Sequence, residues 1–347
     1  MVPDDVRDIA LSQYRRQQRA ARRATNRVQT LWRQIDSGDI SGSWAALAPA
    51  LEQALTVEQV AAAAMADAYL DAVQAAEGAD AAASGAVRPG AFGGIASDGR
   101  PLLSLLYQPV IDWKVRLLAG QSMQDAARGS LASALRITAT QVADAGRGAV
   151  AAGMAGRRTI QGYVRVVQPP ACGRCVILAG KEYGWNTGFQ RHPKCDCIHL
   201  PTTLIARNQH QGRTSSDRFT PTTRPGSGPS GFMDPRAYFN SLSAAEQRRV
   251  FGEAGARAIR EGADMGQVVN ARRGMNAAGT ATRVGTRRGS RYWHVERRRA
   301  LDAGEITADV DRAFRLRSAR LMPEQIFRIA TSREDAVRML RRYGYLT

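Results

Sequence analysis

The stretch that decides the architecture spans residues 172–201, CGRCVILAGKEYGWNTGFQRHPKCDCIHLP, and contains all four cysteines of the 347-residue chain. The cysteines form two tight pairs, Cys172-x2-Cys175 and Cys195-x-Cys197, and His192 stands three residues before Cys195. Thiolate and imidazole are the ligands that a tetrahedral zinc ion prefers, and each pair can bind from one tight turn. Five donors compete for four places. We predict one structural zinc per chain, bound by Cys172, Cys175, Cys195 and either His192 or Cys197.

Two other chemistries are compatible with these cysteines. The first pair could be a thioredoxin-type redox motif, but such a motif follows a strand and opens a helix inside a βαβ unit. Here two prolines precede the pair and a second cysteine pair follows it. Two structural disulfides are the other alternative. Cys195 and Cys197 cannot easily pair with each other, and no signal peptide opens the chain.

A closed zinc site has no open position for water, so the metal would be structural rather than catalytic. The sequence also lacks a nucleophile elbow, a phosphate-binding P-loop and a His-Glu-x-x-His pair. An HNH-type nuclease is the most serious catalytic alternative. It would require a spare histidine as the base and another ligand for a magnesium ion. His199 and Asp196 are spare but lie beside the cysteines, and His210 lies in the linker. We therefore predict that the protein is not an enzyme and has no small-molecule substrate.

The same stretch resembles the phage Mu F-like minor head (head morphogenesis) protein family. The resemblance consists of a CxxC pair, then LAG, then an aromatic and glycine-rich loop, then F-x-x-HP-x-C-x-C and a proline. An Arg-Thr pair before the leading strand also resembles the family. The matching residues are Arg158, Thr159, Cys172, Cys175, Leu178, Ala179, Gly180, Gly188, Phe189, His192, Pro193, Cys195, Cys197 and Pro201.

The resemblance covers residues 100–205, and the C-terminal part is similar to members from actinobacterial phages. It implies a structural minor capsid protein of a tailed bacteriophage, present in few copies inside the head near the portal. It implies a role in procapsid assembly, with DNA packaging or ejection as further roles. The expected partners are the portal, other head proteins and packaged double-stranded DNA. The expected locations are the virion and, during assembly, the host cytoplasm. A zinc-containing DNA-binding protein is the alternative function.

Charge is distributed unevenly along the chain, whose formal net charge is +18. Residues 1–160 carry 17 basic and 15 acidic side chains, whereas residues 232–347 carry 23 and 13. A basic surplus of this kind attracts phosphate backbones or acidic partners. No apolar run is long enough to span a membrane, so we expect no membrane partner.

Four regions follow from the local patterns. Residues 1–100 form an N-terminal helical region, 101–205 the Mu F-like region with the zinc segment, 206–231 a linker, and 232–347 a basic helical region. The predicted fold is therefore mainly α, with a small α+β zinc-bound segment.

Helical periodicity predicts a first, arginine-loaded amphipathic helix to about residue 35 and a short one over 44–55. A basic helix of this kind can bind nucleic acid, a membrane or a large protein partner. Thr56 and Gln59 form a capping box that should open the next helix, ending near residue 77. Residues 78–101 are expected to form a loop.

The middle of the chain should contain one long helix and two strands. The helix is predicted over residues 122–156, where four glycines would bend it or allow close packing. The strands are predicted over 163–167 and 197–201. Aromatic and charged residues between them would cover the zinc: Lys181, Glu182, Tyr183, Trp185 and Phe189.

In the C-terminal region, Asp234, Ser243 and Ser332 carry helix-capping signals, and residues 274–291 are expected to be flexible. An arginine cluster there is the best candidate for nucleic-acid binding. Trp293 beside it could stack on bases, but we favour a role in anchoring the following helix to a core. The cluster comprises Arg283, Arg287, Arg288, Arg291, Arg297, Arg298 and Arg299.

Overall fold

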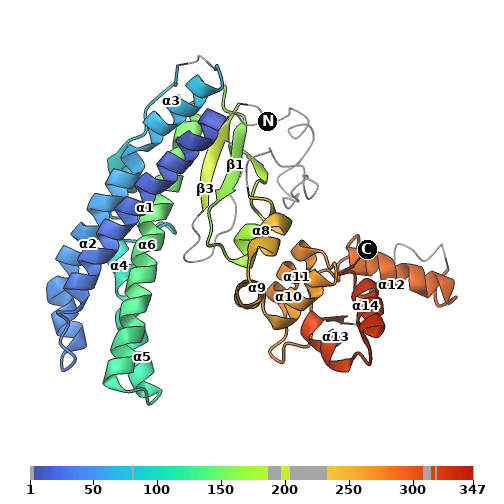
Figure 1. Ribbon diagram of the computed structural model, residues 1–347. Helices are drawn as coiled ribbons and strands as arrows, with labels where there is room; N and C mark the ends of the chain where they lie inside the picture. Colours follow the sequence, from blue (N-terminus) through green and yellow to red (C-terminus); the bar gives the residue numbers. More distant parts are fainter. Residues whose placement is uncertain are drawn as a thin grey trace. The chain divides into compact units, whose positions relative to one another are not determined.

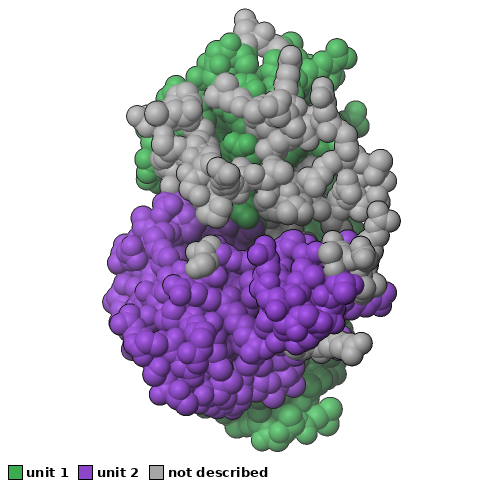
Figure 2. All heavy atoms as spheres, turned by 90° about the vertical axis from the view of Figure 1, so that its right-hand side faces the viewer, with its two compact units in different colours: residues 1–168, 180–232 green, residues 169–179, 233–347 purple. Residues whose placement is uncertain are grey.

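The computed structural model describes residues 4–79, 82–186, 197–203, 233–307, 314–316 and 319–346. Helices dominate these residues and the sheets are small, which confirms the prediction of a mainly helical protein. The chain divides into two compact units, coloured separately in Figure 2. Unit 1 comprises residues 1–168 and 180–232, and unit 2 comprises residues 169–179 and 233–347. Among the described helices, none has the length and apolarity needed to cross a bilayer.

Unit 1 is built on three long helices that lie side by side, with shorter helices at their ends (Figure 1). Its described helices are α1 (Asp4–Trp32), α2 (Ile40–Ala64), α3 (Ala66–Ala76), the 3-10 turn η1 (Pro89–Phe92), α4 (Leu102–Leu106), α5 (Gln108–Leu118) and α6 (Met123–Ala155). Because α6 packs against both α1 and α2, residues 1–100 and most of residues 101–205 belong to unit 1, whereas residues 169–179 belong to unit 2.

The capping box expected at Thr56 does not form, and α2 runs through this position without a break. Gln59 does not turn back to cap the helix. Its side-chain oxygen accepts a hydrogen bond from the amide of Gly94 at 3.0 Å, and its amide group donates to the carbonyl of Ile95 at 3.0 Å. The side chain that signalled a helix start therefore fixes the following loop to α2 instead.

The core of unit 1 changes composition along the bundle. Near the sheet it contains tyrosines and branched residues, among them Tyr69 and Tyr163. Its middle is built from alanines of α1 and α2 around Val142 of α6. At the other end Trp32 and Trp113 are buried, and neither indole N–H has a hydrogen-bond partner. Alanine in the middle lets the helices approach closely, as the composition indicated.

Two glycines of α6 mark such close approaches. A Cβ atom at Gly153 would lie 2.4 Å from Cδ1 of Leu70, and one at Gly146 would lie 2.5 Å from Nε2 of Gln17. Gly129 differs, because its Cβ would meet only the guanidinium end of Arg116, which can move away. The glycines at 146 and 153 are therefore packing positions, while Gly129 is replaceable.

A three-stranded antiparallel sheet with the order β2-β1-β3 ends unit 1. Its strands are β1 (Gly162–Val167), β2 (Glu182–Gly184) and β3 (Cys197–Thr202), so the two predicted strands are confirmed and β2 is additional. Every residue of β1 and β3 is buried. Tyr163 pairs with Tyr183 in register, and their rings stack with centroids 5.2 Å apart.

Unit 2 is a cluster of short helices with one two-stranded sheet (Figure 1). Its described elements are α7 (Gly173–Val176), α8 (Pro235–Ser241), α9 (Ala244–Phe251), α10 (Glu253–Arg260), α11 (Met265–Ala271), the 3-10 turn η3 (Arg272–Gly274), β4 (Ala281–Thr282), α12 (Arg291–Asp302), β5 (Arg320–Leu321), α13 (Pro323–Ile329) and α14 (Arg333–Arg342). The caps expected at Asp234, Ser243 and Ser332 are all present, and Ser243 forms the full capping box with Glu246.

Residues 274–291, expected to be flexible, instead contain β4 and a hydrogen-bonded turn before it. The reason is a buried arginine. Arg320 of β5 is fully buried and donates to the carbonyls of Val284, Tyr343 and Gly344, at 3.2, 2.8 and 3.3 Å. Its guanidinium lies 4.0 Å from the ring centroid of Tyr345. One side chain thus binds the arginine-rich run to the end of the chain.

Candidate functional site

The first cysteine pair forms a compact turn in unit 2. Cys172 is the N-cap of the one-turn helix α7, and its sulfur accepts a hydrogen bond from the amide of Cys175 at 3.5 Å. Cys172 is exposed and Cys175 is buried. An amide that points at sulfur stabilises a thiolate, the form of cysteine that binds metal. The geometry and chemistry of this turn therefore fit half of a zinc site.

The turn is fixed by packing within unit 2. A Cβ atom at Gly173 would lie 3.2 Å from the ring of Phe251, so only glycine fits comfortably there. Val176 is fully buried in the core that contains Phe239 and Phe251. The amide of Ala171 donates to the hydroxyl of Tyr238 at 3.2 Å. These contacts hold the residues between the two cysteines in one conformation.

Cys197 belongs to unit 1, where it begins β3 and is completely buried. It stands opposite Val167 in the sheet, and its carbonyl accepts a 2.7 Å hydrogen bond from Nε of Arg147. Arg147 lies on α6, is 3% exposed, and also bonds Asp144 at 2.5 Å. Strand pairing and this arginine together fix the position of Cys197.

His192 and Cys195 lie outside the described residues, as does Phe189 of the predicted cover. Within the described residues no group of three metal-binding side chains occurs. Of the other cover residues, Tyr183 is buried against Tyr163 and Trp185 is 43% exposed. Burial raises the pKa of the Glu182 carboxyl above its usual range.

Of the three residues named for the nuclease alternative, the structure describes only His199. His199 is 9% exposed, its ring centroid lies 4.2 Å from that of Tyr163, and its carbonyl accepts the hydroxyl of Tyr69 at 2.9 Å. Burial of Tyr69 raises the pKa of that hydroxyl. These contacts are typical of a histidine that packs in a sheet. Asp196 and His210 are outside the described residues.

The structure has one of the features that a thioredoxin-type redox motif requires. The CxxC pair follows β1 and opens α7, as a thioredoxin-type motif would. However, α7 is a single turn, and the described strands around it are antiparallel, whereas a βαβ unit needs parallel strands.

The predicted arginine cluster lies entirely in unit 2, in the turns after β4 and on α12. Arg283, Arg287, Arg288 and Arg298 are exposed. Arg299 is engaged by carboxylates, lying 3.2 Å from Glu296 and 3.6 Å from Glu305. The cluster therefore includes several cations that face solvent and at least one whose charge is already compensated.

Trp293 does not offer its ring to bases. It is 5% exposed, and its indole N–H donates to the carbonyl of Phe314 at 3.4 Å. The guanidinium groups of Arg288 and Arg297 lie 6.0 and 5.8 Å from its ring centroid. The interpretation of Trp293 as the anchor of α12 is confirmed.

The sequence reasoning overlooked Arg147, the residue that positions Cys197. A signal was present, because Arg147 stands three residues before Val150 and seven before Met154, on the buried stripe of α6. A charged residue at such a position is buried only when it has partners.

Comparison with known proteins gives one family match. A family model described as VG15 protein matches residues 5–212, which include both cysteine pairs and His192. No curated protein and no solved structure matches the chain significantly.

Proposed function

The chain belongs to the VG15 protein family, a family of phage gene products, and on this basis we propose that it is a structural minor capsid protein acting in head assembly. The observation that carries the proposal is the extent of the match. It covers the segment whose Cys and His pattern resembles the Mu F-like minor head proteins. In this role the protein lies inside the head near the portal, and in the host cytoplasm during assembly.

Co-purification tests this role. Tagged protein expressed with the head proteins of its phage should sediment with procapsids and be retained after the tag is cleaved. A density map of the portal vertex should then show it inside the head. Recovery of the protein only from the soluble fraction, with normal heads formed, would contradict the proposal.

The metal proposal is one structural zinc held by Cys172 and Cys175 with Cys195 and either His192 or Cys197. It is supported by the donor types and by the amide-to-sulfur hydrogen bond in the first turn. Purified protein should contain about one equivalent of zinc. Cys172→Ser should remove it, and His192→Ala and Cys197→Ser should differ strongly, since one of them is the spare donor.

His294→Ala is the matched control for the histidine variant, because His294 is exposed on α12 and remote in sequence from the cysteines. Its zinc content should equal that of the unaltered protein. Less than a tenth of an equivalent of zinc in protein purified from zinc-supplemented cells would refute the site.

The proposed nucleic-acid contact is non-specific binding of packaged duplex DNA by the exposed arginines of unit 2. Support comes from the surplus of ten positive charges in residues 232–347 and from the solvent-facing cations on α12 and the preceding turns. Removing Arg287, Arg288 and Arg298 together should weaken duplex binding and reduce its salt dependence. An unchanged affinity would remove DNA from the list of partners.

The nuclease alternative has its own test. Four protein ligands on the zinc would leave no place for a reactive water, so purified protein should not cut DNA. Magnesium-dependent nicking of plasmid that disappears in His199→Ala would replace the structural proposal with an enzymatic one.

A further inference from the structure

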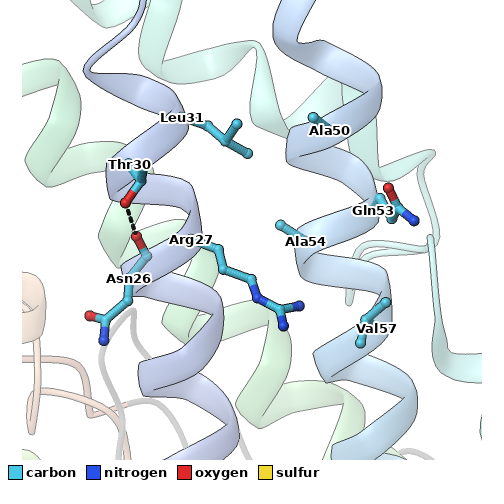
Figure 3. A pocket seen from close by; sticks show the side chains of 8 residues that line it. All are labelled: Asn26, Arg27, Thr30, Leu31, Ala50, Gln53, Ala54 and Val57. Carbon is cyan, nitrogen blue, oxygen red and sulfur yellow. Dashed lines mark hydrogen bonds between the residues drawn. The ribbon is translucent and has the colours of Figure 1, made fainter.

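A solvent-open groove lies between α1 and α2 in unit 1, with a volume of about 560 Å³ (Figure 3). Its apolar lining comprises Leu31 from α1 and Ala50, Ala54 and Val57 from α2. Val57 is 46% exposed, one of the few large apolar side chains of the described residues that face water to this extent. Asn26, Arg27, Thr30 and Gln53 supply the polar lining.

Arg27 points from α1 across this groove towards α2 (Figure 3). It is exposed and makes no ion pair with any described residue. The nearby acid on α2, Glu58, is already engaged by Arg23 through hydrogen bonds of 2.8 and 2.7 Å. This bonding raises the pKa of Arg23. Arg27 therefore lies against apolar walls with its charge uncompensated.

The charge around the groove is one-sided. From Ile9 to Ile35 the chain contains no acidic residue, and the exposed Arg19 lies eight residues before Arg27, about 80° around α1 from it. In contrast, α2 contains no lysine or arginine along its whole length, and its residues beside the groove are alanines, Gln53 and Val57. One wall is cationic and the other is neutral and apolar.

We propose that this groove receives an amphipathic α-helix of a partner head protein. Its apolar residues would cover Val57, and its carboxylates would pair with Arg19 and Arg27. The inference rests on the proposed head-assembly function only for the identity of the partner. The chemistry of the occupant follows from the groove: an apolar face is needed for α2, and acidic residues on one flank are needed for α1.

Two other occupants fit less well. Duplex DNA presents phosphates on both sides of each of its grooves. About half of the phosphates at the contact would then face α2, which contains no lysine or arginine to pair with them. A second copy of this chain would also carry a net charge of +18, and the repulsion between two such chains opposes their association. An acidic amphipathic helix can pack its apolar face against α2 and pair its carboxylates with the arginines of α1.

A synthetic peptide provides the probe. We choose a helix of roughly 20 residues with leucine and alanine on one face and glutamate along one flank. Fluorescence anisotropy with the full-length protein gives its affinity. Arg19→Gln combined with Arg27→Gln should weaken binding roughly tenfold, since each exposed ion pair contributes about two- to fivefold. Val57→Glu should weaken it at least as much.

The matched control removes the same charge from the same helix. Arg15→Gln with Arg22→Gln alters two exposed arginines that lie about 120° and 140° around α1 from Arg27, farther round the helix than Arg19. It should change peptide affinity by less than about twofold. Circular dichroism should show unchanged helix content in all variants, because every altered side chain is exposed.

Three results would overturn the inference. They are unchanged peptide binding in Val57→Glu, an equal loss in the Arg15/Arg22 control, and binding of duplex DNA through Arg19 and Arg27 while the peptide does not bind. Head incorporation is measured separately. If the unaltered protein enters heads and the Arg19/Arg27 variant enters equally well, the groove is not the docking surface and the head function stands. If the unaltered protein is absent from heads, the proposed function fails, whatever the peptide shows.

Discussion

Replacing Arg147 with methionine should destabilise unit 1 strongly. Arg147 is 3% exposed, and its guanidinium joins α6 to the first residue of β3 through the carbonyl of Cys197. It also neutralises Asp144, whose side chain is 10% exposed. Methionine keeps most of the aliphatic volume but removes these two interactions, so a largely buried carboxylate loses the guanidinium of Arg147. Breaking a buried ion pair from one side costs about 3–5 kcal/mol.

The control lies on the same helix. Arg128 and Asp125 have the same three-residue spacing and a similar N–O distance, 2.7 Å against 2.5 Å, but their side chains are 67% and 59% exposed. Solvent screens such a pair, so Arg128→Met should leave stability unchanged within the error of an unfolding curve. The difference between the two variants therefore measures the burial of the Arg147 pair together with its bond to the carbonyl of Cys197.

Urea unfolding followed by tryptophan fluorescence measures the effect. The chain has five tryptophans, and Trp293 is the one in unit 2. In a Trp293→Phe background the signal therefore reports on unit 1 alone. The double variant Asp144→Asn/Arg147→Met should recover part of the loss, because the carboxylate that lost the guanidinium of Arg147 is then removed as well. A loss below about 1 kcal/mol for Arg147→Met, or no recovery in the double variant, would refute the reasoning.

Further predictions concern packing, pH and capping. Gly153→Ala should cost unit 1 about 1–3 kcal/mol by overpacking, whereas Gly129→Ala should stabilise it by about 0.5–1 kcal/mol, both measured in urea. Glu182→Gln should raise the melting temperature at pH 7 but not below the unfolded-state pKa of the carboxyl. Burial raises the pKa of the Glu182 carboxyl in the folded state, so the free energy of unfolding falls as the pH rises from the unfolded-state pKa through the folded-state pKa. Ser243→Ala should cost unit 2 about 1 kcal/mol, read from Trp293 fluorescence.

Local signals predicted much of the fold. Capping residues such as Ser243 act through bonds to their own helix, and they were recognised because no distant partner is needed. Alternating apolar residues likewise predicted the buried strands. The capping box at Thr56 was wrong because Gln59 binds a loop 35 residues away, a tertiary choice that spacing does not encode.

Only part of the candidate site could be predicted from the sequence. The cysteine spacing indicated which side chains could bind a metal, since ligand chemistry is a property of residue type. It did not reveal that Cys172 would cap α7 or that Arg147 would hold the carbonyl of Cys197. The groove at Arg27 was equally hidden. From the sequence alone, Arg27 is expected to be an ordinary solvent-exposed arginine. Only the structure shows that the residues beside it are apolar and that the nearby Glu58 is already bound by Arg23.

The path of the backbone between the two units has a practical consequence for dissecting the protein. An eleven-residue piece of unit 2, residues 169–179, is inserted in the sequence of unit 1, so the backbone passes between the units three times. A protease cut anywhere in 206–231 severs one of these passages and leaves two intact. A gene shortened after Gly231 leaves Val176 and the CxxC turn without the Phe239 and Phe251 core on which they pack. Losses in such a fragment would reflect an incomplete fold, so point variants are the sound route to assigning functions to either unit.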